Sequence, residues 1–278
     1  MADSRLRLAR GPGGVVLPSD RPVAVFGPVS GYDLSPLDGL TLDIIQPFRP
    51  DHDWFAGQGY DCHVVPSGPY GAALVVLPRA KAQARDWIAT AMACTDGPVV
   101  IDGQKTDGID SIHRDLRKRA DVSAPISKAH GKLFWIEEAV DLSDWRAEAQ
   151  TGPEGFLTAP GVFSADAVDP ASRLLGTALP EMMKGTVADL GGGWGYLTAQ
   201  VLKSADVLSV DLVEADHVAL DCARANLHDP RVRFHWADAT VWQPGDPVDH
   251  VVMNPPFHTG RAGDPSLGQA FIAAAARV

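Results

Sequence analysis

A glycine-rich turn set between an apolar strand and a helix constrains the fold of this chain more than any other stretch. The turn reads Asp189-Leu-Gly-Gly-Gly-Trp-Gly195. Before it, Thr186 to Leu190 is predicted to be a short buried strand. After it, Trp194 to Lys203 has the spacing of a helix that buries Leu197 and Val201. A strand and a helix joined by a tight glycine-rich turn are typical of doubly wound α/β sheets.

Three further strands are predicted beyond this helix, and a polar residue follows each of them. The strands are Val207 to Val213, Arg231 to Trp236 and Val248 to Met253. The polar residues at or just after their ends are Glu214, Asp238 and Asn254. Because the parallel strands of such a sheet bring their carboxyl ends to one edge, these side chains predict a ligand site there.

The first half of the chain alternates strands and helices as an open parallel sheet does. Its predicted strands are Pro22 to Phe26, Ala72 to Leu77, Pro98 to Ile101 and Leu133 to Ile136. Its predicted helices are Arg79 to Met92 and Asp110 to Arg119. The segment Gln150 to Gly155 holds turn-forming residues without periodicity and is predicted to be a linker. We therefore expect an α/β protein with two domains, residues 1–150 and 156–278.

The end of the sequence falls inside a predicted helix. Asp264 and Pro265 are good residues for a helix start, and Leu267 to Val278 continues with alanine-rich helical composition and no terminating signal. We therefore expect the second domain to be truncated, with the C-terminal strands that would complete its sheet missing.

Composition excludes several classes of protein. The 278 residues are 45% hydrophobic, which allows two cores. No apolar run reaches the roughly 18 residues of a membrane span, and the N-terminus lacks the apolar core of a secretory signal, so we expect a cytoplasmic protein. The three cysteines form no CxxC pair, which indicates neither a disulfide framework nor a metal site.

The formal net charge of -11 argues against a protein that binds nucleic acid through its overall charge. An RNA substrate would have to meet a local basic patch. The densest candidate holds Arg114, Arg117, Lys118 and Arg119, although a solvated helix face is the more ordinary explanation.

The spacing of the glycines narrows the choice of cofactor. Gly191, Gly193 and Gly195 make GxGxG, whereas a dinucleotide fingerprint would need glycine where Tyr196 stands. No Gly-Lys-Ser/Thr follows the glycines, which excludes the phosphate-binding loop of nucleoside triphosphatases. A nucleoside cofactor without a pyrophosphate remains.

Three acidic residues are candidates for binding that cofactor. Glu214 lies 19 positions after Gly195, close to the spacing at which an acidic residue accepts both ribose hydroxyls. Asp238 is placed to accept from an adenine amino group. A solvated strand end and a helix or turn cap are the respective ordinary alternatives. Asp189 would balance a sulfonium charge or hold the glycine turn.

The stretch Asn254-Pro255-Pro256-Phe257-His258 indicates a site for a planar amino group. Asn254 offers an amide oxygen and Pro255 a backbone carbonyl, and both accept hydrogen bonds from an exocyclic NH2. Phe257 offers a flat apolar face for stacking, and residues before prolines are held extended, so the loop is stiff. The stretch predicts methyl transfer to nitrogen, with the amine held in line with a sulfur–methyl bond. The alternative is a rigid loop with an Asn turn.

With these motifs the chain resembles the class I S-adenosylmethionine-dependent methyltransferases, and within them the ribosomal RNA guanine-N2 methyltransferases of the RsmC type. The resemblance is carried by Gly161-Val-Phe-Ser164, Asp169-Pro-Ala-Ser172, the glycine-rich turn and Asn254 to His258. It covers Phe156 to Val278 well and the first half loosely. It implies two tandem Rossmann-like domains, of which the first is degenerate and has lost its cofactor site.

The resemblance also implies roles for individual residues. For S-adenosyl-L-methionine these are Asp189, Gly191, Gly193, Glu214 and Asp238, with Phe163 helping to cover the cofactor. For the target amine they are Asn254, Pro255, Pro256 and Phe257.

Methylation of a guanine exocyclic amine in ribosomal RNA, with the small subunit favoured, is therefore the leading expectation. The N-terminal domain would position the RNA or the ribosomal particle. The alternatives within enzymes are methylation of a glutamine side-chain amide in a protein and methylation of adenine N6. The alternative of another class is a non-catalytic RNA- or ribosome-binding factor.

Overall fold

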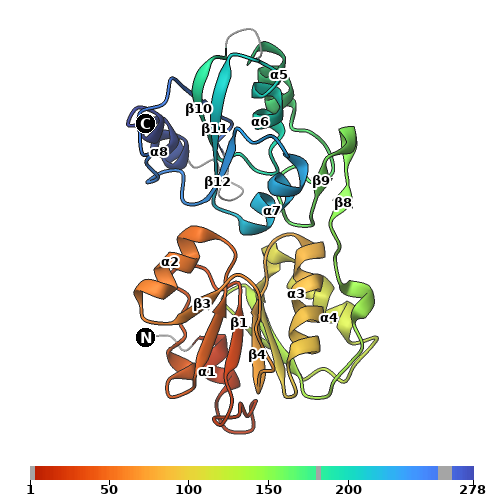
Figure 1. Cartoon of the computed structure of the whole chain (residues 1–278). Helices are drawn as coiled ribbons and strands as arrows, with labels where there is room; N and C mark the ends of the chain where they lie inside the picture. The colour runs from red at the N-terminus through yellow and green to blue at the C-terminus, as the bar shows by residue number, and fades with distance from the viewer. Residues whose placement is uncertain (1–3, 180–182, 256–264) are drawn as a thin grey trace. The chain divides into compact units, whose positions relative to one another are not determined.

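The computed structural model describes residues 4–179, 183–255 and 265–278. The chain divides into two compact units, one of residues 1–47 and 51–148 and the other of residues 48–50 and 149–278 (Figure 1). Within the described ranges, no helix is long and apolar enough to cross a membrane.

The first unit is built on a seven-stranded sheet with the strand order β3-β2-β1-β4-β5-β7-β6. Its strands are β1 (Val23–Phe26), β2 (Leu42–Ile45), β3 (Asp61–His63), β4 (Ala72–Val76), β5 (Val99–Gln104), β6 (Ile126–Lys128) and β7 (Gly131–Ile136). The strands β1 to β5 pair in parallel, as expected, but β7 runs antiparallel to both β5 and β6. The sheet is therefore mixed, and the expectation of an open parallel sheet is corrected at this edge.

The reversal at β7 follows from a two-residue turn. Ala129 and His130, which join β6 to β7, have positive φ angles of 49° and 57°. Two consecutive residues of this kind form the hairpin turn whose twist matches that of the strands it joins. A connection this short permits only antiparallel pairing.

Helices cover both faces of this sheet. The helices are α1 (Arg5–Ala9), α2 (Arg49–Gly57), α3 (Lys81–Cys94) and α4 (Ile109–Leu116), with short 3-10 turns η1 (Ser35–Leu37), η2 (Lys105–Asp107) and η3 (Ser143–Trp145). Neighbouring residues of β1 point to opposite faces, so Phe26 joins a core with Ile88 of α3, while Val25 joins a core with Leu6 of α1.

The basic segment of this unit forms the end of α4 and the turn after it. The helix buries Ile109, Ile112 and Leu116. Arg114, Arg117 and Lys118 are exposed. The guanidinium of Arg119 donates to both carboxylate oxygens of Asp144, at 2.6 and 2.7 Å, and lies over the Trp145 ring. One of the four cations is thus held by an acidic partner, which leaves three exposed charges on one side.

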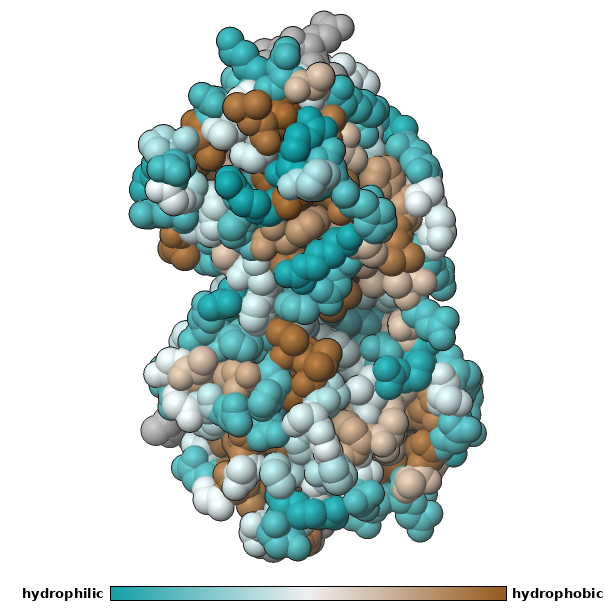
Figure 2. Space-filling model, in the orientation of Figure 1, coloured by the Kyte–Doolittle hydropathy of each residue, from teal (hydrophilic) through white to brown (hydrophobic). Residues whose placement is uncertain are grey.

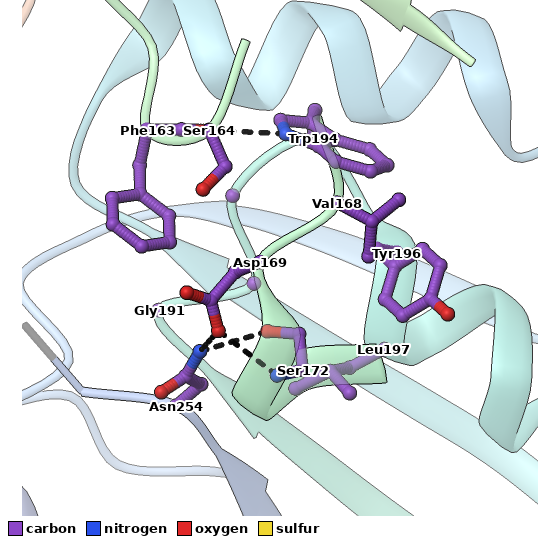
Figure 3. Close-up of a pocket in the computed structure, with 12 residues that line it drawn as sticks. Phe163, Ser164, Val168, Asp169, Ser172, Gly191, Trp194, Tyr196, Leu197 and Asn254 are labelled. Atoms are coloured by element: carbon purple, nitrogen blue, oxygen red, sulfur yellow. Dashed lines mark hydrogen bonds between the residues drawn. The ribbon is translucent and has the colours of Figure 1, made fainter. Parts of the chain in front are cut away.

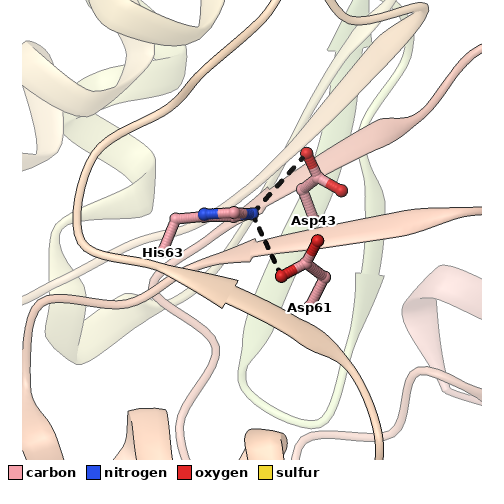
Figure 4. A group of neighbouring side chains, drawn as sticks. All are labelled: Asp43, Asp61 and His63. Carbon is pink, nitrogen blue, oxygen red and sulfur yellow. Dashed lines mark ion pairs between the residues drawn. The ribbon is translucent and has the colours of Figure 1, made fainter.

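Two carboxylates, those of Asp43 and Asp61, lie next to each other on the neighbouring strands β2 and β3 (Figure 4). Asp43 and Asp61 are direct register partners, and like charges placed opposite each other destabilise a sheet. Nε2 of His63 lies 3.4 Å from Oδ1 of Asp61 and 4.0 Å from Oδ2 of Asp43, so the imidazole is close to both carboxylates. The donor atoms are close enough to hold a cation, but the Asp61 side chain is 74% exposed.

The second unit has a four-stranded parallel sheet with the order β12-β11-β10-β13. Its strands are β10 (Gly185–Leu190), β11 (Val207–Glu214), β12 (Val232–Trp236) and β13 (His250–Met253). Its helices are α5 (Pro170–Ala178), α6 (Tyr196–Val201), α7 (His217–Asn226) and α8 (Pro265–Ala275). Figure 1 shows α8 on one face of this sheet and α5, α6 and α7 on the other. Alternate residues of β10 reach both sides, with Val187 packed toward α6 and Leu190 toward α8.

The predicted linker has local structure of its own. Gln150–Thr151 (β8) pairs antiparallel with Leu157–Thr158 (β9), and Pro153–Gly155 (η4) connects them. The side chain of Asn226 accepts from the backbone N–H of Leu157 at 2.7 Å and donates to its carbonyl at 2.9 Å. It also donates to the carbonyl of Trp194 at 2.9 Å, so one amide ties this segment to the glycine turn.

Candidate functional site

The glycine turn follows β10 and starts α6, and its shape depends on glycine. Gly191, Gly193 and Gly195 have φ angles of 75°, 55° and 93°. A Cβ added to Gly195 would lie 2.7 Å from the Leu227 side chain, and one added to Gly192 would lie 2.6 Å from Leu212. The N–H groups of Gly191 and Gly192 donate to the carbonyl of Val213, at 2.8 and 3.1 Å. The turn is therefore fixed to the carboxyl end of β11.

Glu214, the last residue of β11, holds the middle of this turn. Its carboxylate accepts the backbone N–H of Gly193 at 2.8 Å and that of Asp216 at 2.7 Å. Burial raises the pKa of this carboxyl to about 7, against the opposing effect of the two hydrogen bonds. A carboxylate has about four acceptor positions, so Glu214 keeps two for the hydroxyls of a ligand.

Asp189 lies in β10, one of the two inner strands of the sheet, opposite Leu212 of β11 and Val252 of β13. Its side chain is completely buried. Oδ2 accepts from the Thr198 hydroxyl at 2.7 Å, while Oδ1 has no partner in the described part of the chain. Burial raises the pKa of Asp189 to about 6. The carboxylate is thus joined to helix α6.

The side-chain amide of Asn254, just after β13, is held by the start of α5 (Figure 3). Nδ2 donates to Oδ2 of Asp169 and to Oγ of Ser172, both at 2.8 Å. The same Asp169 oxygen accepts the backbone N–H of Ser172 at 2.9 Å and so caps α5. Since a carboxylate can only accept, the amide nitrogen must face Asp169. The amide oxygen points away from both partners, as an acceptor for a donor on the ligand.

A pocket brings the glycine turn, the start of α5 and Asn254 together, whereas Asp189, Glu214 and Asp238 are not among its lining residues. It is lined by Phe163, Ser164, Val168, Asp169, Ser172, Gly191, Gly192, Gly193, Trp194, Tyr196, Leu197 and Asn254. The glycine turn and the Asn254 amide therefore share one cavity, drawn in Figure 3.

Phe163 is the apolar residue of this pocket that is open to a ligand. It is 66% exposed, so its ring is accessible to a ligand in the pocket. Its backbone carbonyl accepts from Nε1 of Trp194 at 3.1 Å, and Trp194 packs against Phe156 and Tyr196. The bulky Trp194 of the glycine turn therefore anchors the segment that carries Phe163.

Asp238 lies two residues beyond β12 and forms a turn cap. Its Oδ1 accepts from the backbone N–H and the hydroxyl of Thr240, at 2.8 and 2.6 Å. This is the ordinary role considered for it; its second oxygen bonds to no described residue, and the adenine contact stays a prediction. Of the stretch predicted for the target amine, Asn254 and Pro255 are described, whereas Pro256 and Phe257 lie outside the described residues.

Sequence reasoning missed the roles of Asp169 and Ser172. Asp-Pro followed by Ser is a recognisable helix start, since Asp caps and Pro occupies the first turn. That pattern predicts where α5 begins. It does not reveal that the capping residue contacts Asn254 at the end of a strand.

Comparison with known proteins finds a family model that matches the second unit. Residues 154–278 match the family model of the methyltransferase small domain. The ribosomal RNA small subunit methyltransferase C of Shewanella sp. strain MR-4 is 28% identical over 222 residues, which are 75% of this chain and 64% of that protein. The protein of the same name from Psychromonas ingrahamii is 30% identical over 72% of this chain and 61% of its own length. The chain thus spans less than two thirds of these two relatives.

A solved structure has the same fold as both units. It is the T. thermophilus 16S rRNA N2 G1207 methyltransferase (RsmC) in complex with AdoMet and guanosine, with a TM-score of 0.78 and 24% identity. The match covers 98% of this chain and 79% of that one. Residues 154–278 therefore match the methyltransferase small domain, and both units have the fold of that RsmC structure.

Proposed function

We propose that this protein transfers a methyl group from S-adenosylmethionine to the exocyclic N2 amine of a guanine in small-subunit ribosomal RNA. The observation that carries the proposal is the Asn254 amide, whose two N–H groups are used by Asp169 and Ser172 so that its oxygen remains an acceptor. The names of the relatives support the choice of ribosomal RNA over other amines.

Residues in and around the glycine turn suit the proposed cofactor. The open side of Gly193, where an added Cβ would meet nothing within 4 Å, leaves room for a ligand to approach the backbone. We assign the ribose hydroxyls to the remaining acceptor positions of Glu214 and the adenine amino group to the open oxygen of Asp238. Phe163 would cover the cofactor, because its exposed ring borders the same pocket as the glycine turn.

Asp189 is assigned an electrostatic role. It is buried at the end of the strand that leads into the turn, and Oδ1 is an unsatisfied acceptor. S-adenosylmethionine, when bound, supplies a methyl group activated by a positively charged sulfur. A buried carboxylate near the sulfonium lowers the free energy cost of holding that positive charge in a site from which water is excluded.

The residues of the chain act mainly by position in the proposed reaction. Asn254 Oδ1 accepts one amine hydrogen and the Pro255 carbonyl the other, which directs the nitrogen lone pair at the methyl carbon. That lone pair forms the new nitrogen–carbon bond. The carbon–sulfur bond breaks at the same time, and the electron pair of the broken bond stays on sulfur. One proton of the amine then leaves to water, so no strong base is required. Pro256 and Phe257 are proposed to stiffen the loop and to stack on the base.

The first unit is proposed to recognise the RNA or the ribosomal particle. Its exposed cations at the end of α4 are the candidate contacts in a chain whose net charge is otherwise negative. We place the protein in the cytoplasm, where ribosomal RNA is modified.

The test is transfer of isotopically labelled methyl to four substrates side by side: small subunits, large subunits, free ribosomal RNA and a protein release-factor preparation. Nucleoside analysis of the product should give N2-methylguanosine. The variant Asn254→Ala should lose transfer while its affinity for the cofactor stays within about twofold of wild type. Turnover by this variant at the wild-type rate would contradict the proposed chemistry.

Other outcomes select the alternatives. Label in protein glutamine or in N6-methyladenosine would replace guanine as the substrate. Cofactor affinity separates an enzyme from a non-catalytic binding factor, because a ligand bound by the folded state alone raises the temperature of unfolding. An unfolding temperature that S-adenosylmethionine does not change would favour the binding factor.

A further inference from the structure

We propose that Asp169 and Ser172 are positioning residues that fix the Asn254 amide in the orientation needed for methyl transfer. The inference rests on the proposed function, because it assigns these two residues to the same reaction. Neither residue is assigned to contact the substrate amine itself.

The geometry uses both hydrogens of one amide nitrogen. Asn254 Nδ2 has two N–H groups, and it lies 2.8 Å from Asp169 Oδ2 and 2.8 Å from Ser172 Oγ. Both acceptors come from the first turn of α5, where Pro170 fixes the start of the helix. The amide is therefore held by the start of a helix that lies more than 80 residues before it in the sequence.

The contact from Ser172 cannot be explained by capping alone. The cap of α5 uses the backbone N–H of Ser172 and the Asp169 carboxylate. The Ser172 hydroxyl takes no part in that cap, yet the side chain is 9% exposed and accepts from Asn254. A buried hydroxyl in the first turn of a helix gains nothing for the helix itself, so its function lies with the amide that it contacts.

Fixing the amide matters because its two ends have opposite hydrogen-bonding character. If the amide turned by half a rotation, its NH2 would meet the NH2 of the substrate, donor against donor. Facing Asp169, the NH2 is bonded to an anion, and the carboxylate polarises the amide and makes Oδ1 a stronger acceptor. Positive charge that develops on the attacking nitrogen is then stabilised by an oxygen already in place.

The matched pair for the test is Ser172→Ala and Thr177→Ala. Thr177 is a hydroxyl residue on the same helix, but it is exposed and donates to the carbonyl of Leu174 within the helix. We expect Ser172→Ala to lower kcat about tenfold while the cofactor Kd and the unfolding temperature stay close to those of Thr177→Ala. Asp169→Asn, which keeps a capping oxygen but removes the charge, should lower kcat at least as much.

A second measurement does not depend on turnover. The side-chain NH2 of Asn254, assigned by its loss from the proton–nitrogen spectrum of Asn254→Ala, should exchange with water more slowly than exposed amides. Exchange should become faster in Ser172→Ala and unchanged in Thr177→Ala. Equal kcat for the two alanine variants, or fast exchange in the wild-type protein, would overturn the positioning role. A wild-type protein with a protected amide but no transfer to any RNA would leave the positioning role intact and refute the proposed function.

Discussion

The hydroxyl of Thr198 on α6 donates to Oδ2 of Asp189 at 2.7 Å, and this bond is the only one that the buried carboxylate makes with described residues. Both residues are completely buried. One hydrogen bond compensates for little of the cost of burying a charge, and burial therefore raises the pKa of Asp189 to about 6. The site keeps an acid that destabilises the folded protein at neutral pH.

The first prediction concerns the pH dependence of stability. An acid whose pKa is raised in the folded state contributes stability below its unfolded pKa and loses it as pH rises through the folded pKa, here between 3.8 and about 6. Asp189→Asn removes this dependence. The difference in unfolding free energy between the variant and wild type should therefore shift in favour of the variant by about 2 kcal/mol from about pH 4 to about pH 8.

Denaturant unfolding without cofactor across that pH range measures this shift. The exposed Asp206→Asn serves as the control for the loss of one carboxylate from the surface. A constant difference between Asp189→Asn and wild type at all pH values would mean that the carboxyl titrates normally.

Glu214 gives a prediction about the cofactor. Its pKa is raised to about 7 by burial, and the ionised form is the better acceptor for two ribose hydroxyls. Affinity for S-adenosylmethionine should therefore fall about tenfold or more from about pH 8 to about pH 5.5. Calorimetric titration at several pH values measures it. Glu214→Gln should bind weakly with no such pH trend, and an equally steep trend in that variant would assign the titration to another group.

Local pattern was sufficient to predict the elements around the glycine turn. The strand predicted at Thr186 to Leu190 is β10, and the one predicted at Val207 to Val213 is β11, each within one residue. Their apolar runs are buried from both sides, so neighbouring residues alone reveal them. By contrast, β2 and β3 were missed, since both strands are short, with Asp43 inside β2 and Asp61 at the start of the edge strand β3.

Contacts distant in sequence were not predictable in this way. Asn254 and its two partners are separated by 85 and 82 residues, and no local periodicity connects a helix cap with a strand end. The hairpin before β7 was missed for another reason. Its two turn residues with positive φ are Ala129 and His130, whereas glycine or asparagine usually marks such a turn in a sequence. The sequence therefore identified Asn254 as an acceptor but not what orients it.

Two glycines of one turn should respond differently to alanine. Gly193 and Gly195 both have positive φ, so an alanine costs about 1 kcal/mol of backbone strain at either position. At Gly195 the added Cβ would also lie 2.7 Å from Leu227, whereas at Gly193 it meets nothing within 4 Å. Gly195→Ala should therefore destabilise the protein by about 2–4 kcal/mol and Gly193→Ala by about 1 kcal/mol. Urea unfolding of both variants tests the difference, and equal losses would contradict the packing around α6.

The exposed cations at the end of α4 give a prediction about RNA. If Arg114, Arg117 and Lys118 contact phosphates, each neutralised phosphate releases counterions. The affinity for RNA then falls as the salt concentration rises. Replacing all three by Gln should weaken RNA binding and reduce the slope of log affinity against log salt by about 2, at every RNA sequence tested.

The matched control for the triple variant lies next to it in the sequence. Arg119→Gln changes a cation that is already bonded to both oxygens of Asp144, so it should leave the salt slope nearly unchanged. Filter binding at four or more salt concentrations, with unfolding temperatures as a check on folding, measures both. A triple variant with the wild-type slope would show that this helix end is a solvated face, and RNA recognition would then have to involve other residues.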